Sequence, residues 1–174
     1  TPIAGAYVLD IEPKGDERGF FARGFCHQEF EAVGLKPNIV QANIGVSRQR
    51  GTLRGLHYQV SPYAETKLIR CTAGAVFDVI VDLRPASSSY RKWLGVELAA
   101  DTRRMIYVPE GCAHGYLTLV DNTEIFYLVS QFYSAEAERG LRWNDPVFGI
   151  EWPIIQDLVI SEKDRRWPDW SEPA

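Results

Sequence analysis

Few cysteines and the lack of a long apolar run exclude several classes of protein. The three cysteines among 174 residues are Cys26, Cys71 and Cys112. An odd number at such wide spacing makes neither a disulfide framework nor a zinc site. We expect reduced, mostly buried thiols in a cytoplasmic protein. No apolar run is long enough to span a bilayer and no signal-peptide pattern is present, so a membrane or secreted protein is not expected.

The chain also lacks an excess of basic residues. Its 19 Lys and Arg against 23 Asp and Glu give a net charge of -4, which argues against non-specific binding to nucleic acid but permits a local basic pocket for a small anion. The 45% hydrophobic and 24% charged residues are ordinary for a globular protein. This length suits one hydrophobic core, and we expect residues 1–174 to form a single domain.

Helical periodicity is scarce, and most apolar residues alternate with a period of two. Strand-like runs occur at 75–84, 104–108 and 125–130, separated by turn signals rich in glycine, proline, asparagine and aspartate. Regularly spaced short strands of this kind predict an all-β sandwich or barrel.

Two short segments depart from the strand pattern. Residues 27–33 form one short helix candidate that Gly34 ends. The polar tail, 161–174, contains Trp167 and Trp170 and is expected to pack back on the body.

The segment 51–59 contains the side chains best suited to catalysis. Arg54 and His57 lie within it, and Lys67 follows ten positions after His57. In a regular strand Arg54 and His57 would point to opposite faces, unless Gly55 bends or bulges the strand. A proton acceptor beside a cation that stabilises an oxyanion would use such residues. A core histidine and a surface arginine are the alternative interpretation.

A second glycine–histidine element occupies 109–115. The two elements, with strands between them, resemble the two motifs of the cupin jelly roll. Metal-binding cupins carry His-x-His in the first motif, whereas this chain has a single imidazole there, His57. Two histidines without a well-placed carboxylate make a poor site for a transition metal, so we predict acid–base chemistry without a metal. Cys112 and His114 are close in sequence, but that spacing does not by itself activate a thiol.

The ordered motifs resemble the dTDP-4-dehydrorhamnose 3,5-epimerases of the RmlC-like cupin superfamily. They include Leu-Arg-Gly-Leu-His-Tyr-Gln at 53–59 and Pro-Glu-Gly-Cys-Ala-His-Gly at 109–115. The resemblance implies a cupin jelly-roll β-sandwich or barrel with short peripheral helices. The blocks that carry it are 16–21, 41–43, 53–59, 67–70, 77–84, 109–115, 143–146, 150–153 and 160–164.

The resemblance implies a nucleotide-linked 4-keto-6-deoxy sugar as the substrate, inverted at carbons 3 and 5. The ketone at carbon 4 acidifies the hydrogens on both carbons and serves as the electron sink, so no cofactor is expected. By resemblance His57 is the base, Asp164 orients it, and Tyr127 reprotonates the opposite face. The expected stabilisers of the enolate oxygen are Lys67, Arg54 and His114.

Taken singly, these residues have ordinary structural interpretations. Asp164 alone would be a solvated aspartate at a helix start, Tyr127 a core tyrosine and Lys67 a solvated strand lysine. Asp78 and Asp82 share one face of a strand, and a paired-carboxylate site there is conceivable. We interpret both as structural, holding loops or arginines such as Arg84.

The family resemblance also predicts how the nucleotide is held. Arg18 is expected to meet the diphosphate and Phe21 to pack on base or ribose, while Gln41 and Asn43 hydrogen-bond the base or phosphates. Tyr133 matches a second tyrosine near the sugar. The resemblance further implies a homodimer in which the N-terminal segment completes the partner's pocket.

Two positions depart from the family pattern. Arg23 stands where typical members carry glutamate, and Glu65 stands near Lys67 where many carry glutamine. Thymine presents an N–H at ring position 3 that suits a carboxylate, whereas cytosine presents a bare nitrogen that suits a donor. Arg23 therefore admits a CDP-linked sugar, although it equally suits solvent or a phosphate. Glu65 either tunes the lysine or caps a loop.

The leading hypothesis is thus a cofactor-independent 3,5-epimerase of dTDP-4-dehydro-6-deoxy-D-glucose. The alternatives are an epimerase of a single centre, 5 or 3, acting on a dTDP- or CDP-linked sugar, and a sugar-binding cupin without catalysis. A metal cupin such as a dioxygenase is disfavoured by the ligands missing from the first motif.

Overall fold

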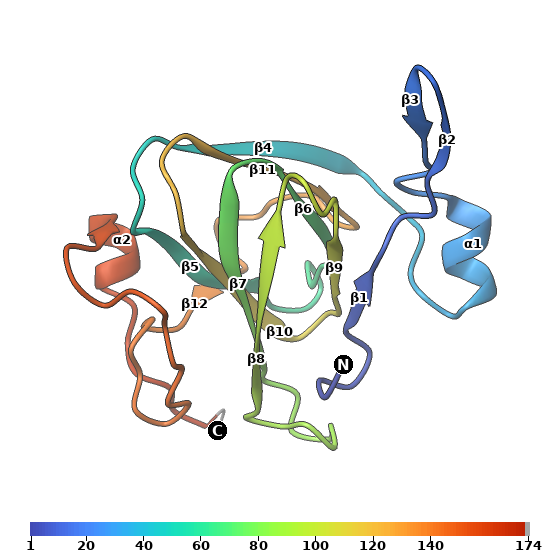
Figure 1. The fold of residues 1–174 in the computed structure, drawn as a ribbon. Helices are drawn as coiled ribbons and strands as arrows, with labels where there is room; N and C mark the ends of the chain where they lie inside the picture. The colour runs from blue at the N-terminus through green and yellow to red at the C-terminus, as the bar shows by residue number, and fades with distance from the viewer. Residues whose placement is uncertain (173–174) are drawn as a thin grey trace.

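The computed structural model describes residues 1–172 and is built mainly from β-strands. Two mainly antiparallel sheets face each other, and only two short helices occur within the described residues (Figure 1). The first sheet has the order β1 (Tyr7–Leu9), β9 (Met105–Val108), β6 (Lys67–Ala73), β11 (Thr123–Val129), β4 (Gln41–Ser47). The second has the order β12 (Glu138–Gly140), β5 (Thr52–Gln59), β10 (Cys112–Thr118), β7 (Ala75–Asp82), β8 (Trp93–Ala99). The predicted all-β sandwich is confirmed.

The predicted strands lie within one or two residues of those observed. The expected runs at 75–84, 104–108 and 125–130 are strands β7, β9 and β11. Gly74, between β6 and β7, has a φ of 73° and Gly111, before β10, a φ of 75°. Glycine adopts these positive φ values without the steric cost that other residues incur, so both turn signals have a structural cause.

Side chains from both sheets fill the space between them. The core includes Ile69 of β6, Ile80 of β7, Ile106 of β9 and Ile125 of β11, all at most 2% exposed. β7 lies inside its sheet and is buried along most of its length. This explains its nearly continuous apolar sequence.

Separate apolar clusters cover the outer faces of the two sheets. On the first sheet, helix α1 (His27–Ala32) places Phe30 against Leu68, Met105 and Tyr107. On the second, the segment after β12 packs apolar side chains against β5, β7 and β10. These clusters lie outside the sandwich, whereas residues of both sheets, including β4 and β5, line a cavity between them.

The predicted helix and the packed tail are confirmed in the described residues. α1 ends one residue before the predicted end, and Gly34 follows it with a φ of 76°. In the tail, β13 (Val159–Ile160) pairs parallel with β5, and α2 (Glu162–Arg165) follows it. Trp170 packs against Phe148. The last two residues of the expected tail, 173 and 174, lie outside the described residues.

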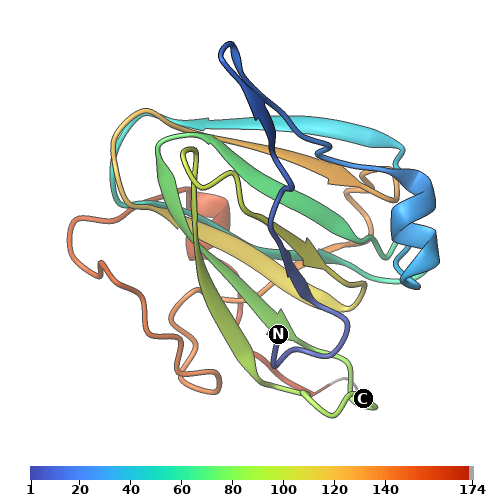
Figure 2. The same cartoon turned by 45° about the vertical axis from the view of Figure 1, so that its right-hand side comes forward.

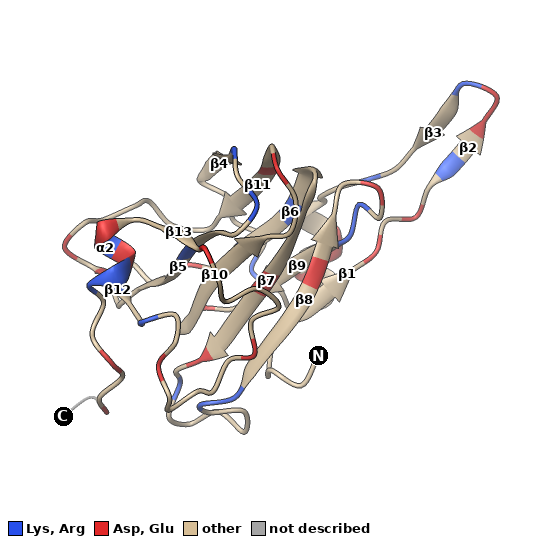
Figure 3. Ribbon diagram, turned by 60° about the vertical axis from the view of Figure 1, so that its left-hand side comes forward, with Lys and Arg blue, Asp and Glu red and all other residues tan. Residues whose placement is uncertain are grey.

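The hairpin formed by β2 (Lys14–Asp16) and β3 (Gly19–Phe21) projects from the body (Figures 1 and 2). All six residues of its two strands are exposed. Charged residues occur on β2 and at the tip (Figure 3). Neither helix found in residues 1–172 has the length and apolar character needed to cross a membrane.

Candidate active site

A bulge in β5 brings Arg54 and His57 to the same side of the sheet. In the pairing with β10, His57 lies opposite His114 and Arg54 opposite Tyr116, so three steps along β5 match two along β10. An extra residue of this kind reverses the strand alternation. Arg54 and His57 therefore line one cavity, as the bend expected at Gly55 requires.

Two glycines permit the close approach of the strands at this bulge. Gly55 has a φ of 116°, and a Cβ atom on it would lie 2.6 Å from the Cα of Gly115. Conversely, a Cβ on Gly115 would lie 2.7 Å from the carbonyl oxygen of Arg54. Any side chain at either position would push the strands apart, which explains the glycine in each motif.

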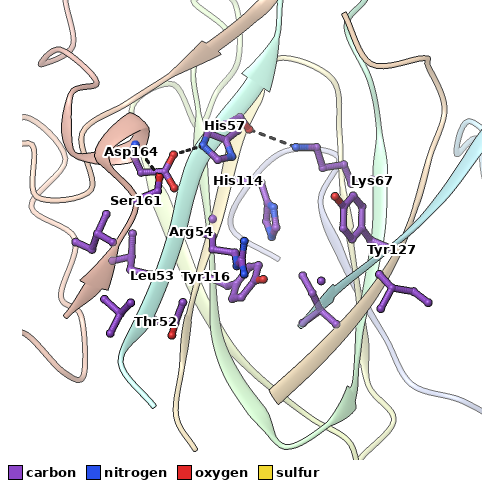
Figure 4. Close-up of a pocket in the computed structure, with 16 residues that line it drawn as sticks. Thr52, Leu53, Arg54, His57, Lys67, His114, Tyr116, Tyr127, Ser161 and Asp164 are labelled. Carbon is purple, nitrogen blue, oxygen red and sulfur yellow. Dashed lines mark hydrogen bonds and ion pairs between the residues drawn. The ribbon is translucent and has the colours of Figure 1, made fainter. Parts of the chain in front are cut away.

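The cavity lies between the two sheets and has a volume of about 520 Å³. His57 lines it from β5 of the second sheet, whereas Lys67 and Tyr127 line it from β6 and β11 of the first. Figure 4 shows His57 and Tyr127 on different sides of the space, with the aliphatic chain of Lys67 beside Tyr127. Arg54 and His114 lie at its centre in this view. The structure thus brings together the residues assigned to the reaction.

His57 forms a close pair with Asp164, which the short helix α2 supplies. Nε2 of His57 lies 2.6 Å from Oδ1 of Asp164, and Gly55 donates its N–H to Oδ2 at 3.3 Å. Ser161 caps the helix by accepting the N–H of Asp164. Burial alone would raise the pKa of Asp164, but the hydrogen bonds from His57, Gly55 and Ser161 outweigh it and lower that pKa. The carboxylate is therefore ionised and fixes the ring.

A second histidine–carboxylate pair lies deeper in the cavity. Nε2 of His114 lies 2.8 Å from Oδ2 of Asp78, which is fully buried. The sequence interpretation of Asp78 as a holder of loops or arginines was wrong, because Asp78 holds a histidine of the cavity. The same interpretation of Asp82 is confirmed, since Arg84 donates to its carboxylate at 2.8 Å.

Lys67 and Tyr127 line the cavity from the first sheet, and Glu65 lies beside Lys67 and lines the adjoining smaller cavity. Nζ of Lys67 lies 3.3 Å from Oε1 of Glu65 and donates to the carbonyl of His57 at 3.4 Å. Burial and then the negative charge of Glu65 raise the pKa of Tyr127, and Arg54 opposes them. The phenol therefore keeps its proton at neutral pH and is suited to act as an acid.

This smaller cavity has a volume of about 220 Å³. Gln41 and Asn43 of β4 line it together with Tyr133. Gln41 accepts the N–H of Tyr133 at 2.9 Å, and the phenol of Tyr133 donates to Glu138 at 2.8 Å. His57, Lys67 and Tyr127 line both cavities. The residues predicted to contact the sugar and the nucleotide, Gln41, Asn43 and Tyr133, therefore adjoin the residues assigned to the reaction.

Comparison with known proteins identifies the family. A sequence model described as dTDP-4-dehydrorhamnose 3,5-epimerase matches residues 1–172. The chain belongs to this epimerase family. The epimerase of Shigella flexneri is 50% identical over 160 residues, which cover 90% of this chain and 87% of that protein.

Two solved epimerase structures show the same cupin-like fold. The epimerase from Elizabethkingia anophelis superposes with a TM-score of 0.95 at 38% identity, covering 98% of this chain and 93% of that one. The epimerase from Bacillus anthracis, with TDP and PPi bound, gives a TM-score of 0.93 at 42% identity, covering 98% and 97%. The family members are isomerases, and the enzyme class expected from the sequence is confirmed.

Three residues expected to bind the nucleotide in this epimerase family lie away from the cavities around His57. Arg18 and Phe21 belong to the projecting hairpin, and their side chains are exposed. Arg18 pairs with Asp16, and Arg23 lies 3.7 Å from Glu29 of α1. The single chain therefore does not bring this group to its own reaction site.

Cysteine chemistry does not contribute to the epimerase site. Burial, the largest effect, raises the pKa of the Cys112 thiol to about 12, so at neutral pH it is not a thiolate nucleophile. All three cysteines are unpaired. Within residues 1–172, no three His, Cys, Asp or Glu side chains are grouped so that they could hold a metal ion.

Sequence reasoning missed three residues around the epimerase site. Asp78 orients His114, Glu138 binds Tyr133, and Trp167 packs its ring edge-on against His57 with centroids 6.1 Å apart. A charged residue inside the apolar run 75–84 was a usable signal for Asp78. For Trp167 the sequence contained no such signal, because its partner His57 comes from a distant segment. Glu138 lies five residues after Tyr133 in a polar stretch, which gave no signal of a contact either.

Proposed function

We propose that the chain is a cofactor-independent 3,5-epimerase of dTDP-4-dehydro-6-deoxy-D-glucose. The observation that supports this most directly is the placement of His57 and Tyr127 on different sides of one cavity, with Lys67 lining it too. Inversion of a carbon centre requires removal of a proton on one face and delivery on the other. The family membership supports the same substrate class.

In the proposed first step, His57 removes the hydrogen from the carbon next to the ketone. The ionised Asp164 holds Nε2, so this nitrogen carries the ring proton and Nδ1 has the free lone pair. Asp164 also stabilises the imidazolium formed when Nδ1 takes the substrate proton. His57 is 31% exposed, which leaves it accessible to a bound sugar.

Cationic and hydrogen-bonding groups then stabilise the enolate oxygen at carbon 4. Lys67 is assigned the main role, with Arg54 and His114 assisting. The Lys67 ammonium is largely buried, and a charge in a water-poor site acts more strongly on a developing oxyanion than one in water. Tyr127 returns a proton from the other face. Proton exchange with solvent then removes the extra proton from His57 and returns one to Tyr127, so that the same two steps can invert the second carbon.

The nucleotide end of the substrate is proposed to meet residues from two subunits of a homodimer. Gln41, Asn43 and Tyr133 line the smaller cavity of the same chain, whereas Arg18 and Phe21 project on the hairpin. A partner's hairpin would bring a guanidinium to the diphosphate and an aromatic ring to the base. The TDP bound to the B. anthracis relative supports dTDP over CDP, and competing titrations with dTDP and CDP test the preference that Arg23 leaves open.

The decisive experiment is incubation of the protein with dTDP-4-keto-6-deoxyglucose in deuterated water, followed by NMR. We expect deuterium at carbons 3 and 5 and a product inverted at both. Label at one carbon alone would instead establish a single-centre epimerase, and no label with binding retained would establish a sugar-binding protein. Exchange with a CDP-linked sugar but not with the dTDP-linked sugar would change the substrate.

Substitution of the base provides the matched test. His57→Ala is expected to abolish exchange at both carbons, because no other group removes the proton. His27→Ala changes an exposed histidine at the start of α1 and should exchange as the unmodified protein does. Exchange by His57→Ala near the unmodified rate would remove His57 from the mechanism.

A further inference from the structure

A carboxylate inside the reaction site has no assigned part in the mechanism. Glu65 lies just before β6, and its side chain is 12% exposed. Its Oε1 is 3.3 Å from Nζ of Lys67, which is itself 10% exposed, and the two side chains line the smaller cavity with Tyr127. A buried carboxylate at this position needs an explanation, because it opposes the positive charge that stabilises an enolate.

The position of Lys67 gives the first part of that explanation. Its ammonium has three N–H donors. One meets the carbonyl of His57 and another meets Glu65. These two partners leave the third donor for a ligand in the cavity. Glu65 therefore limits the conformations of a side chain that is otherwise long and flexible.

The charges around Tyr127 give the second part. A phenol close to several cations loses its proton more readily, and an ionised phenol cannot reprotonate an enolate. The negative charge of Glu65 raises the pKa of Tyr127 and so opposes Arg54, which lowers it. The titratable and charged groups that line the cavities with Tyr127 are Arg54, His57 and Tyr58 of β5, Glu65, Lys67 of β6, His114 and Tyr116 of β10, Tyr133, Glu138 of β12 and Asp164 of α2.

We propose that Glu65 is a positioning residue for the epimerase, which holds the Lys67 ammonium in the cavity and keeps Tyr127 in its proton-donating form. The catalytic consequence of this inference rests on the proposed function. The effect of Glu65 on the titration of Tyr127 does not, because it is a property of the protein without substrate. The negative charge of Glu65 contributes to the raised pKa of Tyr127, after burial. Removal of the Glu65 charge must lower the pKa of Tyr127, so the phenol loses its proton, and with it the ability to act as an acid, at a lower pH.

Glu65→Gln tests the charge while it retains the size and hydrogen-bonding atoms of the side chain. We expect the alkaline limb of the profile of kcat/KM against pH to move to lower pH, because Tyr127 then loses its proton at a lower pH. Glu65→Asp keeps the negative charge on a shorter side chain, so its alkaline limb should lie close to that of the unmodified protein. An unchanged alkaline limb in active Glu65→Gln would overturn the inference.

A titration of the tyrosines without substrate separates this inference from the proposed function. Tyrosine labelled with ¹³C at Cζ reports each phenol by NMR, and Tyr127→Phe identifies the signal of Tyr127. In Glu65→Gln the midpoint of Tyr127 should fall, and that of Tyr133 should not. Glu138→Gln is the matched control, because the hydrogen bond of Glu138 is the largest cause of the raised pKa of Tyr133.

The combined results distinguish the possible errors. A lower Tyr127 midpoint without turnover of the sugar would support the electrostatic role of Glu65 and refute the proposed function. Normal turnover with an unmoved Tyr127 midpoint and an unmoved pH profile would refute the role of Glu65 and leave the function intact. A fall in the Tyr127 midpoint of equal size in Glu138→Gln would also refute the assignment to Glu65.

Discussion

At the scale of single residues, the site contains two histidine–carboxylate pairs with different burial. His57 and His114 each place Nε2 against an aspartate, at 2.6 and 2.8 Å. The His57 side chain is 31% exposed and that of His114 is 9%. A base must reach the carbon that it deprotonates, whereas a group that stabilises an oxyanion needs a dry and rigid position. Burial therefore supports the division of roles between them.

The proposed role of Tyr127 predicts that its substitution slows inversion of the sugar more than exchange of the substrate hydrogen with solvent. Tyr127→Phe should slow inversion by about a hundredfold or more, since general acid catalysis contributes about that much. Exchange of the substrate hydrogen into solvent should slow far less, because His57 alone removes it. Both rates come from one NMR time course in deuterated water.

Tyr63→Phe is the control for this prediction, because Tyr63 is exposed and lines neither cavity around His57. Equal slowing of exchange and inversion in Tyr127→Phe would argue against its role as the acid on the opposite face.

At the scale of elements, the C-terminal segment supports β5 from outside the sandwich. Gly140 of β12 pairs with His57, and Trp167 lies against both. α2 on the same segment supplies Asp164. Lys163 binds Glu138 of β12 with Nζ–oxygen distances of 2.5 and 2.6 Å, which joins α2 to the second sheet.

A side chain at position 140 should therefore displace Trp167 and, through it, disturb the position of His57. Gly140→Ala would place a Cβ atom on the indole ring of Trp167, and such overpacking costs about 1–3 kcal/mol. We expect kcat to fall roughly tenfold or more because His57 loses its support. Urea denaturation and steady-state kinetics measure the two effects. In a Trp167→Ala background the Gly140→Ala substitution should cost less stability than in the unmodified protein, and strict additivity would contradict the contact.

A second element-scale prediction concerns the connection between β7 and the N-terminal segment. Asp82 is fully buried and accepts hydrogen bonds from Arg84, Ser87 and Ser89. Arg84 and Ser89 also bind the backbone of Ala4. Burial by itself raises the pKa of Asp82, but these hydrogen bonds outweigh it and lower the pKa from 3.8 to about 2.

A lowered pKa means that Asp82 stabilises the fold above its unfolded pKa, and that this contribution is lost as the pH falls through about 2. The shift corresponds to about 2 kcal/mol. Asp82→Asn should therefore be less stable than the unmodified protein at pH 7, and the difference should shrink between pH 4 and pH 2. Urea denaturation over that range measures it, and a difference independent of pH would refute the prediction.

At the scale of the whole molecule, the β2–β3 hairpin projects from the body, and no helix or strand among residues 1–172 covers it (Figure 2). It exposes Phe20 and Phe21, the latter at 70%. Arg103, in the connection between β8 and β9, lies over the ring of Phe20 at 4.7 Å, which supports the base of the hairpin. Such an arm is suited to contact a second copy of the chain.

If the hairpin completes the partner's site, two defective variants should complement each other. His57→Ala retains an intact hairpin, and a variant with Arg18→Ala and Phe21→Ala retains an intact cavity. Refolded together in equal amounts, they should recover about one quarter of the unmodified activity, because half of the dimers are mixed and each mixed dimer has one complete site. No recovery, with mixed dimers present, would place the hairpin in its own chain's site or outside any site.

The sequence alone determined the class of fold, the strands and the motifs. Alternating apolar residues specify strands whatever their partners are, and glycines such as Gly74 and Gly111 mark turns because other residues are strained there. By resemblance, the sequence also named a group of residues for the reaction, and the structure places these side chains around one cavity. Their separate roles stay predictions until the experiments above are done.

Only the tertiary structure decided which side chains meet. The bulge at Gly55 depends on its pairing with Gly115, and the strand register, not the local sequence, turns Arg54 and His57 to one side. Asp164 is buried against His57 because a turn of helix from the end of the chain packs on β5. The pairing of Asp78 with His114 was likewise set by long-range packing, since burial and charge act through space and not along the chain.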